Sequence, residues 1–499
     1  MIRDLYDKLL VRLLELADLG AVASLLEWDQ ETNMPPKGAA ARGSQRGVLA
    51  GILHERFVSP ELRELVESLR ARLPELEPDQ QVVVRETARD QDRAIKVPTD
   101  LVKAIAKLES ESLHAWGEAR KEGTFSTFAP FLERLLALKR QVAEAIGYEE
   151  TAYDALLETY EHDMRCSILV PLFAELRQRL VPLVQRIVER GPVEPRFIVG
   201  TFPTEHQRQL GQRVAEAMGF DFEAGRLDRS VHPFCQGLHP TDVRLTWRYD
   251  ESDLRPALFG LIHEAGHGLY EQGLDAPHWG TPLCAATSFG MHESQSRLWE
   301  NIVGRSRAFW RFFLPVAKEV FPASLSGCTL DSIYREVNVV RPSLIRVEAD
   351  EVTYNLHIIL RYELERALFS GDLEVADLPA AFNERMEQDL GVRPPDDTQG
   401  CLQDIHWAMG LFGYFPTYTL GNLFAAILWK QACRDITGLE DSIAAGHLLV
   451  LRDWLREKVH RQGRRYSAAE LIERVAGHAP GVDDFASYLE GKFVPLYRL

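Results

Sequence analysis

Three ionisable residues stand together at positions 263–267, where the sequence reads HEAGH. His263 and His267 are four residues apart, so on a helix both imidazoles project from the same face. Neutral imidazole is a good ligand for a borderline-soft cation such as zinc. Glu264 borders the same face, where its carboxylate can take a proton from a water that the metal activates. The spacing therefore predicts a metal site with a general base beside it.

The element that carries these residues is predicted as a helix over 254–273, LRPALFGLIHEAGHGLYEQG. Pro256 suits the first turn of such a helix and Gly273 suits its end. Apolar residues cover most of its circumference, which predicts a largely buried helix, and Gly266 and Gly268 allow another segment to approach closely. The same histidine spacing occurs by chance on surface helices, but burying three ionisable groups is costly unless a metal or a charge partner offsets it.

A third metal ligand is expected from the segment SFGMHESQSRLWEN, residues 288–301. Glu293 follows His267 at a distance that leaves room for a loop and a returning helix. Two histidines and one glutamate would leave one position open for water, as in catalytic zinc sites. Glu293 and Arg297, four residues apart, also fit a simple surface ion pair. Three other residues compete as third ligand, namely Glu271, His278 and His292.

Composition limits the classes of partner. The 499 residues include 57 Lys and Arg against 74 Asp and Glu, a net charge of −17 that argues against nucleic acid or anionic membrane as partner. No apolar run approaches the roughly 20 residues that span a bilayer, and no signal peptide is apparent. Six cysteines without a short pairing pattern predict reduced thiols in a cytoplasmic protein.

Leucine spacing and long periodic segments predict a mainly α protein that forms a single unit over 1–499. Three short segments, 197–202, 229–234 and 242–249, are rich in β-branched or aromatic residues and are bounded by Gly or Pro. We expect 229–249 to form a small antiparallel hairpin before the 254–273 helix. Other helices are expected at 1–32, 40–70, 79–120, 127–147, 167–190, 288–304, 329–340, 345–369, 376–389, 403–412, 420–435 and 441–460.

Several segments together resemble the metallocarboxypeptidases of the Taq type over essentially the whole chain. HEAGH is followed by HESQSR at 292–297, and further similar segments are EWDQETNMPPKGA (27–39), HPF (232–234), DVRLT (242–246), IRVEAD (345–350), GCLQDIHW (400–407) and GYFPTYTLGN (413–422). The resemblance implies that His263, His267 and Glu293 bind one zinc ion and that Glu264 is the general base. It also implies a helical saddle with a deep groove, a homodimer, and removal of single C-terminal residues with broad tolerance.

An enzyme that removes C-terminal residues must recognise a free carboxylate, and arginine is the bidentate donor suited to this. Arg346 and Arg244 occupy the motifs, and the resemblance does not choose between them. Arg346 equally fits a structural ion pair with the neighbouring Glu348 or Asp350. Arg244 equally fits the outward face of a strand.

Polar residues in the remaining motifs are candidates for handling the substrate. We prefer Tyr418 as the donor to the oxyanion, with Tyr414 as the alternative, and His406 as a catalytic and substrate-binding donor. His232 would bind the substrate backbone or support a turn. Asp404 would orient a histidine or cap a helix. Buried Tyr and His equally often satisfy a hydrogen bond in the core.

The predicted function is that of a zinc-dependent metallocarboxypeptidase acting on peptides with a free C-terminal carboxylate. Cobalt fits the same ligands. An oligopeptidase that cuts internally or releases dipeptides is one alternative. A peptide-binding or scaffolding protein with a structural metal is another, although structural zinc normally has four protein ligands.

Overall fold

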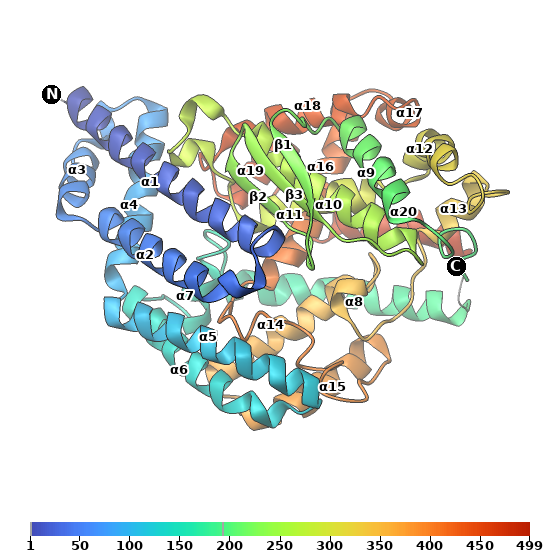
Figure 1. Cartoon of the computed structure of the whole chain (residues 1–499), viewed down its shortest axis with the longest axis horizontal. Coiled ribbons are helices and arrows are strands. Elements are labelled where there is room, and N and C mark those ends of the chain that lie inside the picture. Colours follow the sequence, from blue (N-terminus) through green and yellow to red (C-terminus); the bar gives the residue numbers. More distant parts are fainter. Residues whose placement is uncertain (1, 192–193) are drawn as a thin grey trace. The chain divides into compact units, whose positions relative to one another are not determined.

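The computed structural model describes residues 2–191 and 194–499, and most of them lie in helices (Figure 1). The described chain separates into two compact units. The first comprises residues up to Ile95 with Pro195–Val337 and Ile427–Ala479, and the second comprises Lys96–Glu194, Asn338–Ala426 and Pro480–Leu499. The predicted fold class, mainly α with one small sheet, is confirmed. A single catalytic domain with a saddle shape and a groove stays a prediction.

The first unit holds the HEAGH segment and the three strands of the sheet. Its helices before the sheet are α1 (Ile2–Thr32), α2 (Ala39–Phe57), α3 (Pro60–Arg70), α4 (Pro78–Lys96) and α9 (Thr204–Met218). After the sheet come α10 (Leu254–Gly273), α11 (Phe289–Arg297), a π-helix at Leu298–Val303, α12 (Arg307–Val320), α13 (Leu330–Glu336), α17 (Leu439–Ala444), α18 (Leu449–Lys458) and α19 (Ala468–Ala476).

The sheet contains β1 (Gly225–Arg229), β2 (Cys235–His239) and β3 (Asp242–Trp247) in the order β1-β3-β2. β2 and β3 are antiparallel, as expected for a hairpin, but β1 runs parallel to β3. The sheet is therefore mixed, and the prediction of a purely antiparallel hairpin over 229–249 is wrong in its first half. The charged sequence of β1, GRLDR, lacks the apolar alternation by which strands are recognised.

Two of the expected strands do not form. Segment 229–234 turns the chain after β1, because Pro233 has no N–H to donate to a ladder and the Ser230 hydroxyl donates to the His232 carbonyl oxygen at 2.7 Å. Segment 197–202 makes only an isolated bridge at Val199.

Helix α10 has the predicted bounds, and most of its residues are buried. The Asp253 side chain caps it by accepting the backbone N–H of Arg255 at 2.9 Å. The helix contacts β3, α9 and α11, so it lies within the core of the first unit. Other elements therefore pack against the helix that carries HEAGH on several sides.

The second unit is built around the buried helix α14 (Tyr354–Ser370), which contacts α6, α7, α8 and α15. Its other helices are α5 (Thr99–Glu122), α6 (Ala129–Ile146), α7 (Ala152–Leu157), α8 (Cys166–Glu189), α15 (Leu378–Leu390) and α20 (Asp483–Tyr497). Helix α16 (Pro416–Asp435) runs from the second unit into the first.

Two helices expected in the second unit are shorter or absent. The segment 345–369 begins with a single 3-10 turn, because the Asp350 carboxylate accepts two backbone N–H groups from the residues that follow it, at 2.9 and 3.0 Å. The segment 403–412 consists of turns, and Gly410 adopts a left-handed φ of 64° there. Pro416 occupies the first position of α16, which proline favours.

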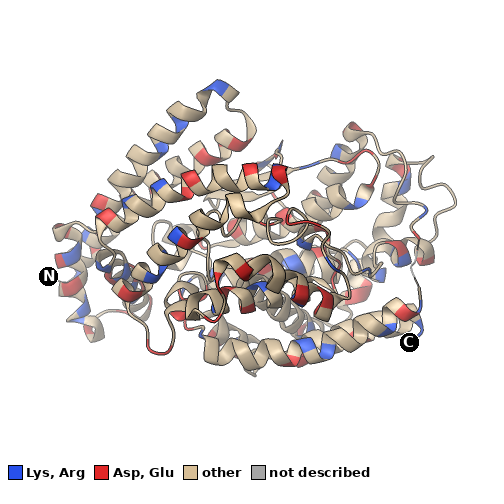
Figure 2. Ribbon diagram, turned by 90° about the horizontal axis from the view of Figure 1, so that it is seen from below, with Lys and Arg blue, Asp and Glu red and all other residues tan. Residues whose placement is uncertain are grey.

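The acidic excess is distributed over many elements. Figure 2 shows Lys and Arg interspersed with Asp and Glu along the helices. Among the described residues, no helix is long and apolar enough to cross a membrane.

Candidate metal centre and substrate-binding residues

His263, His267 and Glu293 come together between α10 and α11. Glu293 Oε2 lies 3.7 Å from His263 Nε2 and 3.4 Å from His267 Nε2. The ligand atoms of the three residues all lie within 4.8 Å of one another. Of the competing third ligands, His278 lies in a different segment, where it pairs with Asp275. The predicted set of three therefore forms a group that could hold one metal ion.

Gly266 explains how the two helices approach so closely. A Cβ atom at this position would lie 2.7 Å from the Ser296 Cα atom and 2.8 Å from the Gln295 carbonyl oxygen. Those backbone atoms cannot move aside without displacing α11. The absence of a side chain at Gly266 thus sets the distance between α10 and the helix that carries Glu293.

The protonation of these donors suits a divalent cation. Burial lowers the pKa of His267 to about 3, so its imidazole is neutral. Burial would raise the pKa of Glu293, but Arg297 and His263 hold it well below its usual range. Burial alone would lower the pKa of His263, but the nearby carboxylates of Glu293 and Glu300 raise it. A bound cation would take the place of the proton that these carboxylates favour. Neutral imidazole and ionised carboxylate are the ligand forms that zinc binds.

Glu300 is a site residue that sequence reasoning missed. Its Oε2 atom lies 3.0 Å from Nδ1 of His263, and its Oε1 atom accepts from Arg305 at 3.1 Å. The residue lies in the π-helix that continues α11, and π-turns of this kind are frequent at functional sites. A carboxylate that follows the third ligand by two helical turns was the available signal.

Arg297 does pair with Glu293, as the alternative interpretation proposed, but the pair is not on the surface. Arg297 Nε donates to Glu293 Oε1 at 2.6 Å, and Glu293 is only 6% exposed. The second carboxylate oxygen of Glu293 remains directed at the two histidines. The ion pair therefore orients the glutamate and does not compete with metal binding.

His292 and Glu271, the other competing ligands, lie on the far side of His267. His292 Nδ1 lies 2.6 Å from His267 Nδ1, and His292 Nε2 lies 2.7 Å from Glu271 Oε1. The His267 Nδ1 atom also lies 3.1 Å from the His292 carbonyl oxygen. These contacts fix the ring of His267 with its Nε2 atom toward Glu293.

Glu264 is buried beside the three candidate ligands. Burial raises the pKa of its carboxyl to about 7, with Glu293 and Glu300 acting in the same direction. A carboxyl group with a pKa near neutrality can both accept and return a proton under physiological conditions. The residue thus has the properties expected of a general base.

Arg244 and His232 lie in the sheet region of the first unit. Arg244 Nε and Nη2 donate to the two oxygens of Asp242 at 2.9 and 3.0 Å, and its guanidinium lies 4.4 Å from the centre of the Trp28 ring. The positive charge of Arg244 is therefore paired with the single negative charge of Asp242. His232 is exposed in the loop after β1, where its carbonyl oxygen accepts from Ser230; this contact supports the turn.

Arg346 in the second unit is paired with Asp404, and not with its sequence neighbours Glu348 or Asp350. Its Nε and Nη2 atoms both lie 2.8 Å from Asp404 Oδ1. The other Asp404 oxygen accepts from Arg361 Nε at 2.6 Å. Asp404 therefore neither hydrogen-bonds a histidine nor caps a helix, since it binds two arginines.

His406, Tyr414 and Tyr418 gather beside Arg346. His406 Nε2 lies 3.1 Å from the Tyr418 hydroxyl, and the Tyr414 ring centre lies 5.5 Å from that of His406. Burial lowers the pKa of His406 to about 3, with Arg346 acting in the same direction. The Arg346 guanidinium lies 5.0 Å from the centre of the Tyr418 ring. The second unit thus brings together four of the predicted catalytic and substrate-binding residues.

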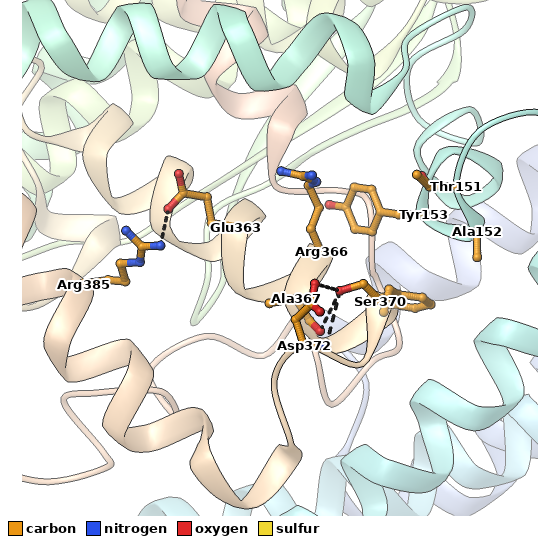
Figure 3. A pocket seen from close by; sticks show the side chains of 10 residues that line it. Thr151, Ala152, Tyr153, Glu363, Arg366, Ala367, Ser370, Asp372 and Arg385 are labelled. Atoms are coloured by element: carbon orange, nitrogen blue, oxygen red, sulfur yellow. Dashed lines mark hydrogen bonds and ion pairs between the residues drawn. The ribbon is translucent and has the colours of Figure 1, made fainter.

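The second unit also contains a cavity of about 340 Å³ (Figure 3). Its wall includes Glu363, paired with Arg385, and Asp372, whose carboxylate accepts from the Ser370 hydroxyl. None of the predicted site residues lines it. The cavity was not expected from the sequence.

Comparisons with known proteins agree with the motifs. The family model described as carboxypeptidase Taq (M32) metallopeptidase matches residues 8–493. The chain is 45% identical to thermostable carboxypeptidase 1 of Thermus thermophilus and 38% identical to carboxypeptidase 1 of Bacillus subtilis, with 99% of both chains covered each time. It is 41% identical to the solved M32 carboxypeptidase of Deinococcus radiodurans R1, with a TM-score of 0.97 over 99% of this chain and 100% of that one. The chain therefore belongs to the carboxypeptidase Taq (M32) metallopeptidase family and is a metal-dependent peptide hydrolase.

Proposed function

We propose that this enzyme is a zinc-dependent metallocarboxypeptidase that releases single C-terminal amino acids from peptides with broad tolerance for the side chain. The observation that carries the proposal is the convergence of His263, His267 and Glu293 beside the buried Glu264. The names of the relatives, which are carboxypeptidases, support the same activity.

The zinc ligands would be the Nε2 atoms of His263 and His267 and the Oε2 atom of Glu293. When bound, zinc would polarise the scissile carbonyl and lower the pKa of the attacking water. Three protein ligands leave a coordination position open, which distinguishes a catalytic site from a structural one. Cobalt would fit the same donors.

Glu264 would transfer a proton in both steps of the reaction. Its carboxylate accepts a proton from the water as the water oxygen attacks the scissile carbonyl carbon. The protonated Glu264 then donates that proton to the nitrogen of the leaving amino acid as the C–N bond breaks. A pKa of about 7 lets one residue carry out both transfers.

Substrate recognition is assigned to the polar groups of the second unit. Arg346 is the better candidate for the terminal carboxylate, because the charge of Arg244 is matched one to one by Asp242. Tyr418 would donate to the oxyanion, and His406 would bind the substrate backbone, with Tyr414 beside them. His232 is proposed as a further contact to the substrate backbone.

Mass spectrometry of two peptides tests this function. A peptide with a free C-terminus should lose one residue at a time, whereas the same peptide with a C-terminal amide should persist. Internal fragments or released dipeptides would instead indicate an oligopeptidase. A chelator that leaves the fold intact should stop hydrolysis; continued hydrolysis by the metal-free chain would contradict a catalytic metal.

The resemblance also supports a homodimer located in the cytoplasm, which we include in the proposal. Light scattering of the purified chain at several concentrations tests the dimer. A mass equal to that of one chain at all concentrations would contradict it.

A further inference from the structure

Arg346 and Arg361 share a single carboxylate in the interior of the second unit. Arg346 is 5% exposed, Arg361 is 1% exposed and Asp404 is 8% exposed. Each oxygen of Asp404 serves one arginine, Oδ1 at 2.8 Å from Arg346 and Oδ2 at 2.6 Å from Arg361. The two arginines and the one carboxylate together carry a net charge of +1 in the interior of the unit.

The neighbouring groups do not supply the missing negative charge. Burial keeps the imidazoles of His406 and His357 neutral, with pKa values below their ordinary one. Burial raises the pKa of Glu365, one turn further along α14 than Arg361, to about 7, so its carboxyl is mostly neutral below that pH; it accepts from Trp407, the backbone N–H of Gly413 and a tyrosine hydroxyl. Burying an uncompensated cation is costly, so its presence in a folded enzyme points to an anion that binds there.

Arg361 is held in place by contacts that leave it no access to a substrate. Its Nη1 donates to the His357 carbonyl oxygen at 2.7 Å, and its guanidinium lies between the rings of Phe382 and Phe415, 5.2 and 5.7 Å from their centres. Arg346 is also buried: its Nη1 donates to the Tyr354 hydroxyl at 2.9 Å, and its guanidinium lies 5.0 Å from the centre of the half-buried Tyr418 ring. Arg361 is therefore linked to Arg346 through the shared carboxylate of Asp404 and is not itself exposed to a ligand.

We propose that Arg361 is a positioning residue for substrate recognition, because it engages one oxygen of Asp404 and so shares the negative charge that would otherwise be matched by Arg346 alone. Arg346 then presents a net positive charge to the terminal carboxylate of the peptide. The inference rests on the proposed assignment of the substrate carboxylate to Arg346. Arg361, which lies outside the recognised motifs, supplies the second positive charge at Asp404, so that Arg346 keeps a net positive charge for the substrate carboxylate.

The charge count gives a sharp test. Arg361→Met leaves one cation and one anion, so KM for a free-ended peptide should rise at least about tenfold while kcat changes less than about threefold. The double variant Arg361→Met/Asp404→Asn again leaves one excess positive charge on Arg346, and its KM should return to within about threefold of the wild-type value. Arg177→Met is the matched control, since Arg177 is a largely buried arginine of the same unit that pairs with Glu363 and Asp389. KM of this control should not change.

The outcomes distinguish a failure of the Arg361 inference from a failure of the proposed function. An unchanged KM in Arg361→Met overturns the inference, and so does a KM in the double variant that stays as high as in the single variant. If Arg361→Met does not fold, the double variant is the test. A KM of the double variant within threefold of the wild-type value supports the inference, and a KM tenfold higher contradicts it. If the wild-type enzyme cleaves the amidated peptide as well as the free-ended one, the failure lies in the proposed carboxylate recognition itself.

Discussion

Glu300 lies 3.0 Å from His263, with its Oε2 atom facing Nδ1 of the imidazole. Burial would raise the pKa of Glu300, but the contact with His263 and the charges of Arg297 and Arg305 lower it to about 2. An ionised carboxylate can only accept, so the Nδ1–H of His263 donates to it. The lone pair of His263 is then on Nε2, the atom that faces Glu293.

The first prediction concerns this contact. Glu300→Gln should weaken metal binding by about tenfold to a hundredfold, because the neutral amide no longer fixes the tautomer and basicity of His263. Competition with a chelator of known affinity measures the dissociation constant. Glu319→Gln, which alters an exposed pair with Arg213, is the control and should bind metal as the wild type does. Equal affinities of the two variants would show that Glu300 does not support the ligand.

Glu264→Gln tests proton transfer separately from metal binding. The amide cannot accept the proton of the attacking water, so kcat should fall by about 10²–10⁴-fold. Metal content, measured by elemental analysis, should stay at the wild-type level, because Glu264 is not one of the three proposed ligands. A variant that keeps more than about a tenth of the wild-type kcat would exclude the role of general base.

The convergence of the two histidines in the candidate metal site was predictable because their geometry is local. His263 and His267 converge through helix periodicity alone, and Gly266 indicates that a second backbone can approach closely. Glu300 was missed although it follows Glu293 by two helical turns, and local spacing did not predict the π-helix at Leu298–Val303 in which it lies.

The pairs of the second unit depend on contacts between distant parts of the chain. Local spacing suggested Glu348 or Asp350 as partner of Arg346, but the fold brings Asp404 there from 58 residues away. The parallel strand β1 was missed for a similar reason, because its partner β3 lies beyond an intervening strand. Neither relationship leaves a periodic signal in the sequence.

Gly266→Ala should disrupt the metal centre without removing a ligand. The added methyl group would meet the backbone of α11 at less than 3 Å and push Glu293 away from the histidines. We expect metal content to fall well below one ion per chain. Gly260→Ala lies on the same helix with no atom within 4 Å of the added methyl, so it should keep its metal and gain up to about 1 kcal/mol of helix stability. If both variants bind metal equally, the close approach is not what positions Glu293.

Glu365 should make the stability of the enzyme fall as the pH rises from 5 to 8. Burial raises the pKa of this carboxyl to about 7, from 4.5 in the unfolded chain, although Tyr153 and Gly413 donate to it. Between these values the unfolded chain releases the proton while the folded enzyme retains it, so the free energy of unfolding decreases with pH, by about 3 kcal/mol in total. Glu365→Gln removes this titration, and its urea midpoint should therefore decline less than that of the wild type between pH 5 and pH 8. The exposed Glu387→Gln, which alters a surface pair with Arg393, should follow the wild type. Parallel pH dependences of Glu365→Gln and the wild type would mean that Glu365 is ionised throughout this range.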